Sequence, residues 1–321
     1  MPKLVFCGTP RFAVPTLEAL IAAGHEIPLV VTQPDRPAGR SQQLAAPAVK
    51  QTALAAGLTV TQPEKIRNNV EFRAQLEAIA PDAIVVVAYG RIIPPWMLAL
   101  PRLGCINLHA SLLPKYRGAA PIQWAVAMGE TFTGNTTMLL EEGLDTGPIL
   151  LQQALAIGPE QTAVELFEEL ANGGAPMMVE TLAGLADGTI EPRPQDHSRA
   201  SLAPLLTRED GRMEFAARTA TELKNRWRGF QPWPGAYALL DGKKLIVHRM
   251  DVVDASAFAA PASVVPGQIV VENQRLFAAC VDGTWIELIE VQLEGKKRLV
   301  AAEFLRGMQF AAGAHFDARS S

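Results

Sequence analysis

The sequence predicts an α/β protein in which an open, mostly parallel sheet domain precedes a small antiparallel β domain. Short apolar runs alternate with helical patterns in the first part of the 321-residue chain, whereas the last part contains Asp-Gly pairs between strand-like runs. A stretch rich in proline separates the two patterns, and prolines at such spacing disfavour regular hydrogen-bonded structure. We therefore expect a first domain at residues 1–188, a linker laid along the surface at 189–207 and a second domain at 208–321.

The first domain has the β-α-β order of a parallel sheet with helices on both faces. Its strand-like runs are short, apolar and rich in β-branched residues, as expected of strands covered on both sides. The helical patterns end at helix-stopping residues such as Gly24 and Pro81. This order is typical of a Rossmann-like fold. We predict strands within residues 4–7, 29–32, 83–88, 136–140 and 149–153, and helices at 16–23, around 72–79 and from 162 onward.

The second domain has the pattern of connected hairpins. Asp241-Gly242 and Asp282-Gly283 each lie between two strand-like runs, and such a two-residue connection is a strong hairpin signal. About five antiparallel strands in so small a domain favour a partly closed, OB-like β-barrel. We predict strands at residues 237–240, 243–247, 268–271, 276–281 and 285–291, and helices around 221–227 and 301–308.

Composition and charge exclude several classes of protein. Apolar residues make up 49% of the chain and charged residues 19%, with a net charge of −4, so neither disorder nor a general affinity for nucleic acid is indicated. No apolar run of about 18 residues occurs and no signal-peptide pattern precedes the first strand, so we expect no membrane association and a cytoplasmic location. The three cysteines are widely spaced, which favours reduced thiols, and Cys105 is interpreted as a buried apolar residue rather than a nucleophile.

Common cofactor and nucleophile motifs are missing from the sequence. After the first predicted strand, Gly8-Thr9-Pro10 supplies one of the three glycines that a dinucleotide site needs. The sequence contains no P-loop, no HExxH zinc motif and no GxSxG nucleophile elbow. The five histidines are too far apart along the chain for a local metal cluster, so we expect no metal.

Asn107 and His109 form an unusual polar pair at the end of an apolar strand-like run. Residues i and i+2 of a strand project to one face, so the two side chains are expected to point together. Ligands of open α/β sheets bind outside the carboxyl ends of the strands. An amide beside an imidazolium can hold a carbonyl oxygen that becomes negative during acyl transfer. The alternative is that one residue caps a helix and the other is a hydrogen-bonded core histidine.

Asp145 is a third candidate group. It lies in a glycine-containing loop, residues 141–148, between two predicted strands. An aspartate in this loop could reach His109, stabilise its protonated form and help to collect the proton that an attacking amine loses. The alternative is an aspartate that only forms a turn.

Together these residues resemble the folate-dependent formyltransferases. Asn107-x-His109, the segment SLLPKYRGAAP at residues 111–121 and Leu144-Asp145-Thr146-Gly147 are similar to the catalytic Asn-His-Asp set and the Ser-Leu-Leu-Pro signature of that family. The resemblance implies 10-formyltetrahydrofolate as the formyl donor and no metal. It also implies that Asn107 and His109 hold the formyl oxygen while Asp145 supports His109 and proton transfer. The folate-binding residues that it implies are Tyr89, Gly90, Arg91, Ile92, Ser111, Leu112, Leu113 and Pro114.

Further motifs resemble the family members that act on a charged initiator tRNA. They are Gly8-Thr9-Pro10, the segment at residues 32–40 and the segment at residues 228–236. The resemblance implies that methionyl initiator tRNA is the partner and that its α-amino group accepts the formyl group. It also makes the long polar loop at residues 33–49 the element that probes the tRNA acceptor end. The tRNA-binding residues that it implies are Arg36, Arg40, Arg226 and Arg228.

Other functions stay open on the sequence. A sugar-nucleotide amine formyltransferase uses the same folate donor and carries the same three catalytic residues, and a hydrolase would release formate from that folate. A non-catalytic RNA-binding protein would use the second domain as its working part. The segments at residues 32–40 and 228–236 favour formylation of tRNA, and the intact Asn-His-Asp set argues against a non-catalytic protein.

Overall fold

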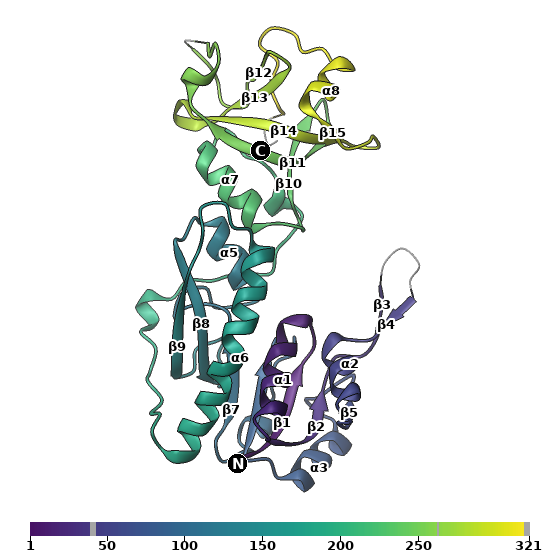
Figure 1. Ribbon diagram of the computed structural model, residues 1–321, viewed down its shortest axis with the longest axis vertical. Coiled ribbons are helices and arrows are strands. Elements are labelled where there is room, and N and C mark those ends of the chain that lie inside the picture. The colour runs from purple at the N-terminus through teal and green to yellow at the C-terminus, as the bar shows by residue number, and fades with distance from the viewer. Residues whose placement is uncertain (39–42, 262, 318–321) are drawn as a thin grey trace. The chain divides into compact units, whose positions relative to one another are not determined.

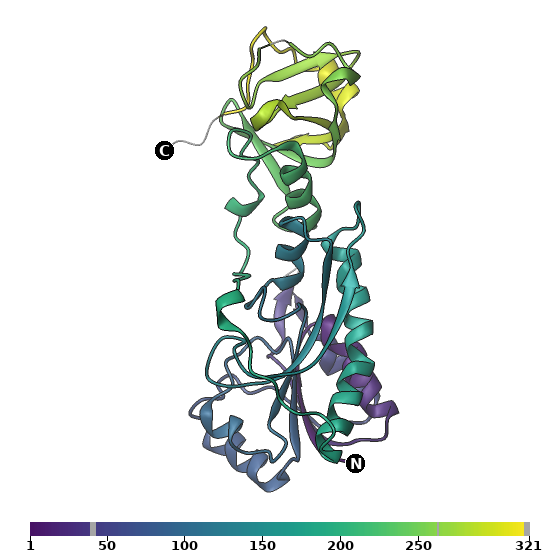
Figure 2. The same cartoon turned by 90° about the vertical axis from the view of Figure 1, so that its left-hand side faces the viewer.

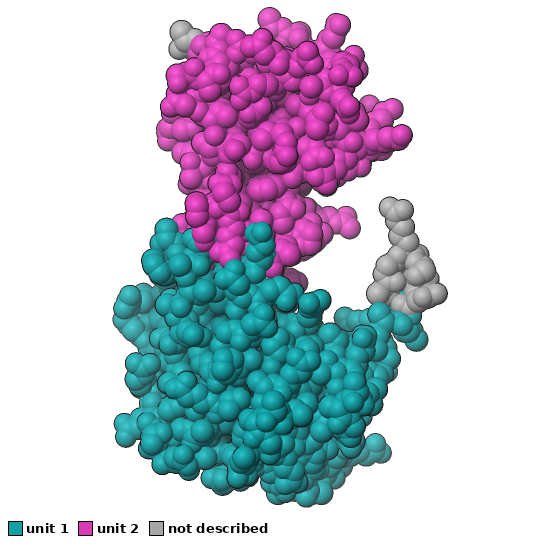
Figure 3. All heavy atoms as spheres, in the orientation of Figure 1, with its two compact units in different colours: residues 1–122, 131–157, 165–204 teal, residues 123–130, 158–164, 205–321 magenta. Residues whose placement is uncertain are grey.

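The computed structural model describes residues 1–38, 43–261 and 263–317. The chain forms two compact units (Figure 3). Unit 1 comprises residues 1–122, 131–157 and 165–204, and unit 2 comprises residues 123–130, 158–164 and 205–321. Within the described residues, no helix is both long enough and apolar enough to cross a membrane.

Unit 1 is built on a seven-stranded sheet with the order β5-β2-β1-β6-β7-β8-β9 (Figure 1). The first five strands of this order pair in parallel, and β8 and β9 are added antiparallel. The prediction of a Rossmann-like, mostly parallel sheet is confirmed. The strands are β1 (Lys3–Gly8), β2 (Glu26–Val31), β5 (Val60–Thr61), β6 (Ala83–Val87), β7 (Cys105–His109), β8 (Phe132–Leu139) and β9 (Ile149–Ala156).

Helices cover both faces of this sheet (Figure 1, Figure 2). On one face, Phe12 before α1 packs edge-on against Phe167 of α6, and Gly174 of α6 lies against the side chain of Leu108 in β7. On the other face, α3 and α4 contribute Phe72 and Met97 to the core that includes alternate residues of the central strands. The helices are α1 (Val14–Ala22), α2 (Ala48–Ala55), α3 (Val70–Ile79), α4 (Pro95–Leu98) and α6 (Ala163–Asp187).

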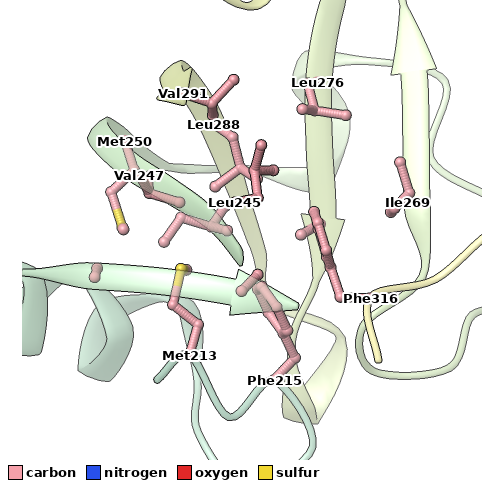
Figure 4. Close-up of a cluster of buried hydrophobic side chains, with 14 of the residues drawn as sticks. Met213, Phe215, Leu245, Val247, Met250, Ile269, Leu276, Leu288, Val291 and Phe316 are labelled. Carbon is pink, nitrogen blue, oxygen red and sulfur yellow. The ribbon is translucent and has the colours of Figure 1, made fainter. Parts of the chain in front are cut away.

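Unit 2 is built on an antiparallel sheet with the order β10-β11-β14-β13-β12, to which β15 pairs along β14. Its apolar core gathers side chains from these strands around Leu245 and Leu288 (Figure 4). Asp241-Gly242 joins β10 to β11 with a positive φ angle at both residues, as a two-residue hairpin turn requires, so this predicted hairpin is confirmed. Asp282-Gly283 lies in a five-residue connection, residues 280–284, between β13 and β14, so these strands pair antiparallel as predicted but not through a two-residue turn. The strands are β10 (Ala236–Leu240), β11 (Lys243–Val253), β12 (Ile269–Glu272), β13 (Arg275–Ala279), β14 (Trp285–Leu293) and β15 (Leu299–Val300), and the helices include α5 (Pro121–Ala127), α7 (Ala220–Gly229) and α8 (Ala301–Arg306).

Two stretches from earlier in the chain belong to unit 2 and contact α7: residues 123–130, which include most of α5, and residues 158–164, whose carbonyls accept from Arg228. A Cβ atom at Gly229 would lie 2.6 Å from the backbone N of Ala127 and 2.6 Å from the backbone O of Gln123, so the close approach of the two helices requires glycine. Trp124 packs edge-on against Phe230, with ring centroids 5.3 Å apart. The sequence patterns did not predict this contact.

Two segments interpreted as irregular contain ordered pairing. In the loop at residues 33–49, β3 (Arg36–Ala38) and β4 (Gln43–Ala45) form a two-stranded sheet. In the predicted linker, isolated bridges pair Arg193 with Ile149 and Leu202 with Arg117. Proline removes a donor only at its own position, so neighbouring residues remain able to pair. Residues 193–203 of the predicted linker are therefore tied into unit 1 by backbone pairing.

Candidate active site

Asn107 and His109 lie at the carboxyl end of β7, between the parallel strand β6 and the antiparallel strand β8. They alternate with Leu108, which points toward α6, so both belong to the opposite face of the sheet. Asn107 is 9% exposed and His109 is 6% exposed. The register places Asn107 opposite Met138 and His109 opposite Thr136 of β8. The polar pair is therefore nearly buried at the edge of the sheet where ligands of this fold class bind.

The loops after the neighbouring parallel strands meet at the same edge. The hydroxyl of Thr9, after β1, donates to the carbonyl of Tyr89, after β6, at 3.0 Å. The side-chain amide of Gln33, after β2, donates to the carbonyls of Tyr89 at 3.2 Å and Gly90 at 3.3 Å. These bonds fix the backbone that follows β6 beside the strand that carries the Asn-His pair.

One ring nitrogen of His109 is fixed by the backbone. Nε2 lies 2.9 Å from the carbonyl oxygen of Tyr116, and a carbonyl can only accept, so Nε2 carries a proton. Nδ1 is the other ring nitrogen. It faces Asp145, whose Oδ2 lies 3.7 Å away.

Asp145 has a left-handed backbone conformation, with φ of 50°. It lies in the loop between β8 and β9, and its side chain is largely buried. Oδ2, the oxygen that faces His109, also accepts a hydrogen bond of 2.8 Å from the backbone N–H of Gly118. This carboxylate is placed to stabilise a positive charge on the imidazole.

The site has donors available for a ligand oxygen. In the described part of the chain, the side-chain amide of Asn107 takes part in no hydrogen bond, so both of its N–H donors remain unused. Cys105, two residues before Asn107, is not a comparable reactive group, because burial raises the pKa of its thiol to about 12. Among the described residues, no group of three or more His, Cys, Asp or Glu side chains is arranged to hold a metal ion.

Gln195, which contacts the Asp145 loop, and Arg117, which contacts Gln195, were missed in the sequence. The side-chain amide of Gln195 donates to the backbone carbonyls of Asp145 at 2.9 Å and Gly147 at 2.7 Å. Arg117 donates in turn to the side-chain oxygen of Gln195. Arg117 lies within the Ser-Leu-Leu-Pro signature segment, which was a usable signal, whereas nothing in the proline-rich stretch distinguishes Gln195 from its neighbours.

The predicted folate residues occupy two loops of unit 1, and they differ in what their side chains can reach. Tyr89 is fully buried in the core, and the hydroxyl of Ser111 donates to the carbonyl of Lys115 inside its own turn at 2.7 Å. The side chains of these two residues therefore shape the loops. Leu113 is also buried, whereas Ile92 is exposed and Leu112 is half-buried. The other predicted residues are Gly90, with φ of 79°, and the half-buried Arg91 and Pro114.

The predicted tRNA residues are not equivalent. Arg36 is exposed on β3, and Arg40 lies outside the described residues. Arg228 is buried, and its guanidinium donates to the backbone carbonyls of Gly158 at 3.0 Å and Gln161 at 2.8 Å. Arg226 is largely covered and lies over the rings of Trp124 and Phe230. Burial lowers the pKa of both guanidinium groups in α7, and their contacts are those of packing residues.

A groove of about 190 Å³ lies on the outer side of β10 and β11 in unit 2. Two basic and two aromatic side chains are among those that line it, and the ammonium of Lys244 lies 4.4 Å from the centre of the Tyr237 ring. Trp233 in the wall of the groove is half exposed. The lining residues are Arg208, Trp233, Pro234, Ala236, Tyr237, Lys244 and Ile246.

An amide and an imidazole beside a carboxylate lie at the carboxyl edge of a Rossmann-like sheet, and groups of this kind can hold a carbonyl oxygen that becomes negative during acyl transfer. Comparison with known proteins gives the kind of group. The chain belongs to the formyl transferase family: the model described as formyl transferase matches residues 2–182, and the model described as formyl transferase, C-terminal domain, matches residues 205–309.

Individual relatives cover nearly the whole chain. The methionyl-tRNA formyltransferase of Acidobacterium capsulatum is 67% identical over 309 residues, which are 96% of this chain and 97% of that protein. The methionyl-tRNA formyltransferase of Koribacter versatilis is 57% identical over 95% of each chain. Among solved structures, an N-formyltransferase from Helicobacter canadensis in complex with folinic acid and dTDP-3-aminofucose matches with a TM-score of 0.64, at 19% identity, over 90% of this chain and 99% of that one. This likeness concerns the fold.

Proposed function

We propose that the chain transfers the formyl group of 10-formyltetrahydrofolate to the α-amino group of methionyl initiator tRNA. The observation that carries the proposal is the meeting of Asn107, His109 and Asp145 at one sheet edge. The acceptor is inferred from the relative of 67% identity that is named for it. Because charged initiator tRNA is used in the cytoplasm, a cytoplasmic location is part of the same proposal.

The first step is attack of the neutral α-amino nitrogen on the formyl carbon. A C–N bond forms and the carbonyl electron pair moves to the formyl oxygen. An α-amino group with a pKa of about 7.7–8.0 is partly neutral near pH 7, so it needs little activation. The negative charge that develops on the formyl oxygen needs more stabilisation than the amine needs activation. Hydrogen bonds from the Asn107 amide and from Nδ1 of His109 would supply it.

The second step is collapse of the tetrahedral intermediate. The formyl C=O bond re-forms and the bond to N10 of tetrahydrofolate breaks, while the proton that the amine has lost passes to N10. Asp145 supports this transfer by its position 3.7 Å from the imidazole of His109. No covalent bond to the protein forms, in keeping with the buried thiol of Cys105.

The folate would lie between the loop after β6 and the Ser-Leu-Leu-Pro turn after β7. Arg91, Ile92, Leu112 and Pro114 keep side-chain surface there, and we assign direct contact to them. Gly90 would contribute its backbone. Tyr89, Ser111 and Leu113 would act by holding the loops in shape, because their side chains are buried.

For the RNA, we place one contact surface in unit 2 at the groove lined by Trp233, Tyr237, Lys244 and Arg208. Cationic groups attract phosphates, and exposed aromatic rings stack on unpaired bases, so this combination suits a single-stranded or flipped-out nucleotide. The sheet that carries the groove would curl into the OB-like barrel that the sequence favours, with the core around Leu245 inside it. Arg36 and, outside the described residues, Arg40 remain the proposed contacts from the loop at residues 33–49.

Lys243 and Lys244 provide a matched test of this groove. Both substitutions to alanine remove one positive charge from β11, but Lys244 lines the groove and Lys243 does not. Lys244→Ala and Trp233→Ala should each raise the KM for charged tRNA several-fold more than Lys243→Ala, with an unchanged KM for folate. Equal effects of the two lysine variants would remove the groove from the proposal.

The activity is tested by offering radiolabelled 10-formyltetrahydrofolate with methionyl initiator tRNA, with a nucleotide-linked amino sugar or with water alone. We expect label only on the methionyl-tRNA. Transfer to the sugar alone would replace the proposed acceptor, and release of formate alone would indicate a hydrolase.

A further inference from the structure

We propose that Gln195 and Arg117 are positioning residues that hold Asp145 beside His109. The inference rests on the proposed formyl transfer, because it identifies what keeps the carboxylate of that reaction in place. Both residues are buried, at 6% and 7% exposure. Both lie in unit 1, and neither contacts the formyl oxygen in the proposed mechanism.

Gln195 clamps the loop that carries Asp145. One side-chain nitrogen reaches the carbonyls of two loop residues, Asp145 and Gly147, at 2.9 and 2.7 Å. An amide nitrogen has two N–H donors, so each carbonyl receives one of them. Asp145, in the loop between β8 and β9, has a left-handed φ of 50° and is not held by strand pairing. These two bonds therefore supply a restraint that the strands do not.

Arg117 sets the direction of the Gln195 amide. Its Nε and one terminal nitrogen lie 3.2 and 2.7 Å from Oε1 of Gln195. A guanidinium only donates, so the oxygen end of the amide must face it and the nitrogen end must face the loop. The same terminal nitrogen lies 3.0 Å from Nδ1 of His197.

The backbone around Arg117 touches both members of the His-Asp pair. The preceding residue, Tyr116, binds Nε2 of His109 through its carbonyl, and the following residue, Gly118, donates its N–H to Asp145. The backbone of Arg117 is in turn anchored by the carbonyl of Ser201 and the N–H of Ala203, at 2.8 and 2.7 Å. The stretch from Gln195 to Ala203 thus fixes the separation of His109 and Asp145 from two sides.

A role in positioning differs measurably from a role in stability alone. A misplacement of about 1 Å at reacting groups can lower a rate by about 100-fold, whereas the loss of a buried hydrogen bond elsewhere leaves turnover unchanged. Asn135 provides the matched control. Its buried amide also donates to a backbone carbonyl, that of Leu170 at 2.8 Å, but it lies on the opposite face of the sheet from His109.

The experiment compares Gln195→Ala, Gln195→Glu and Asn135→Ala in the full chain. Gln195→Glu keeps the length of the side chain and its oxygen toward Arg117 but replaces the N–H donors, so it tests the clamp even if the alanine variant folds poorly. Both Gln195 variants should lower kcat by about 10- to 100-fold, with KM values for both substrates within about threefold of the wild type. Asn135→Ala should keep kcat within about twofold. A kcat in Gln195→Glu that matches Asn135→Ala overturns the proposal.

A second measurement is independent of activity. The Gly118 amide proton is held by Asp145, so its hydrogen exchange followed by NMR reports the position of the carboxylate. Exchange should be at least about tenfold faster in Gln195→Glu and unchanged in Asn135→Ala. Unchanged protection in Gln195→Glu overturns the proposal. If the wild type formylates no methionyl-tRNA, the proposed function fails, and the exchange result still decides whether Gln195 positions Asp145.

Discussion

Replacing Asn107 or His109 by alanine should remove similar amounts of catalysis but different amounts of stability. Each variant loses one donor to the formyl oxygen, and one such donor is worth about 2.7–4 kcal/mol, or about 10²- to 10³-fold in kcat. The stabilities differ because the partners differ. The Asn107 amide has no hydrogen-bond partner in the described residues, so Asn107→Ala should change the free energy of unfolding by less than about 1 kcal/mol.

His109→Ala should in addition remove the hydrogen bond between Nε2 and the Tyr116 carbonyl and leave a cavity in place of a nearly buried ring. The lost bond and the cavity together should lower the free energy of unfolding by about 1–3 kcal/mol. The assay combines single-turnover formyl transfer at saturating substrates with urea unfolding of the same preparations. The reasoning is refuted if Asn107→Ala retains more than a tenth of the wild-type rate, or if it unfolds as easily as His109→Ala.

Three further predictions follow from other parts of the molecule. Gly229→Ala would place a Cβ 2.6 Å from backbone atoms of α5, so thermal denaturation should show a loss of about 1–3 kcal/mol, whereas Gly307→Ala, whose Cβ would meet no atom closer than 3.8 Å, should cost far less. The KM for charged tRNA should rise steeply with salt between 50 and about 200 mM while that for folate stays nearly constant; equal responses in steady-state assays would argue against phosphate contacts. Hydrogen bonds from the Lys3 N–H and then from Arg102 lower the pKa of Asp82. The ionised Asp82 carboxylate therefore stabilises the fold fully above about pH 4, and this stabilisation is lost as the pH falls through the lowered pKa. The difference in free energy of unfolding between wild type and Asp82→Asn, measured by urea titration, should shrink below about pH 4.

Local patterns predicted the strand that carries two of the proposed catalytic groups. The period of two along Cys105–His109 was enough to put Asn107 and His109 on one face, because side-chain direction in a strand depends on nothing beyond the strand. The turn at Asp241-Gly242 was equally local, since it depends on the φ angles of two residues. The link from His109 to Asp145 crosses 36 positions, so periodicity could not give it; the position of Asp145 in a loop between two predicted strands suggested it, and the resemblance to a family supported it.

Contacts between distant segments account for what the sequence did not predict. No pattern in the neighbouring sequence predicts that Gln195 is buried. Its partners, Asp145, Gly147 and Arg117, come from two other loops. Arg228 resembles a surface cation in the sequence, but its guanidinium is buried against the backbone carbonyls of Gly158 and Gln161. Residue type predicts what a side chain can bond, but not which distant backbone will supply the partner.

Residues 193–203, here called the strap, determine where the chain can be cut into separate domains. The two family models match residues 2–182 and 205–309, so the strap belongs to neither matched region. Its bridges to Ile149 and Arg117 nevertheless make it part of the first unit. A fragment that stops at residue 188, or a chimera joined there to a foreign second domain, would lack the strap. A fragment or chimera of the first unit should therefore end after Pro204, so that it keeps residues 193–203 and their backbone bridges.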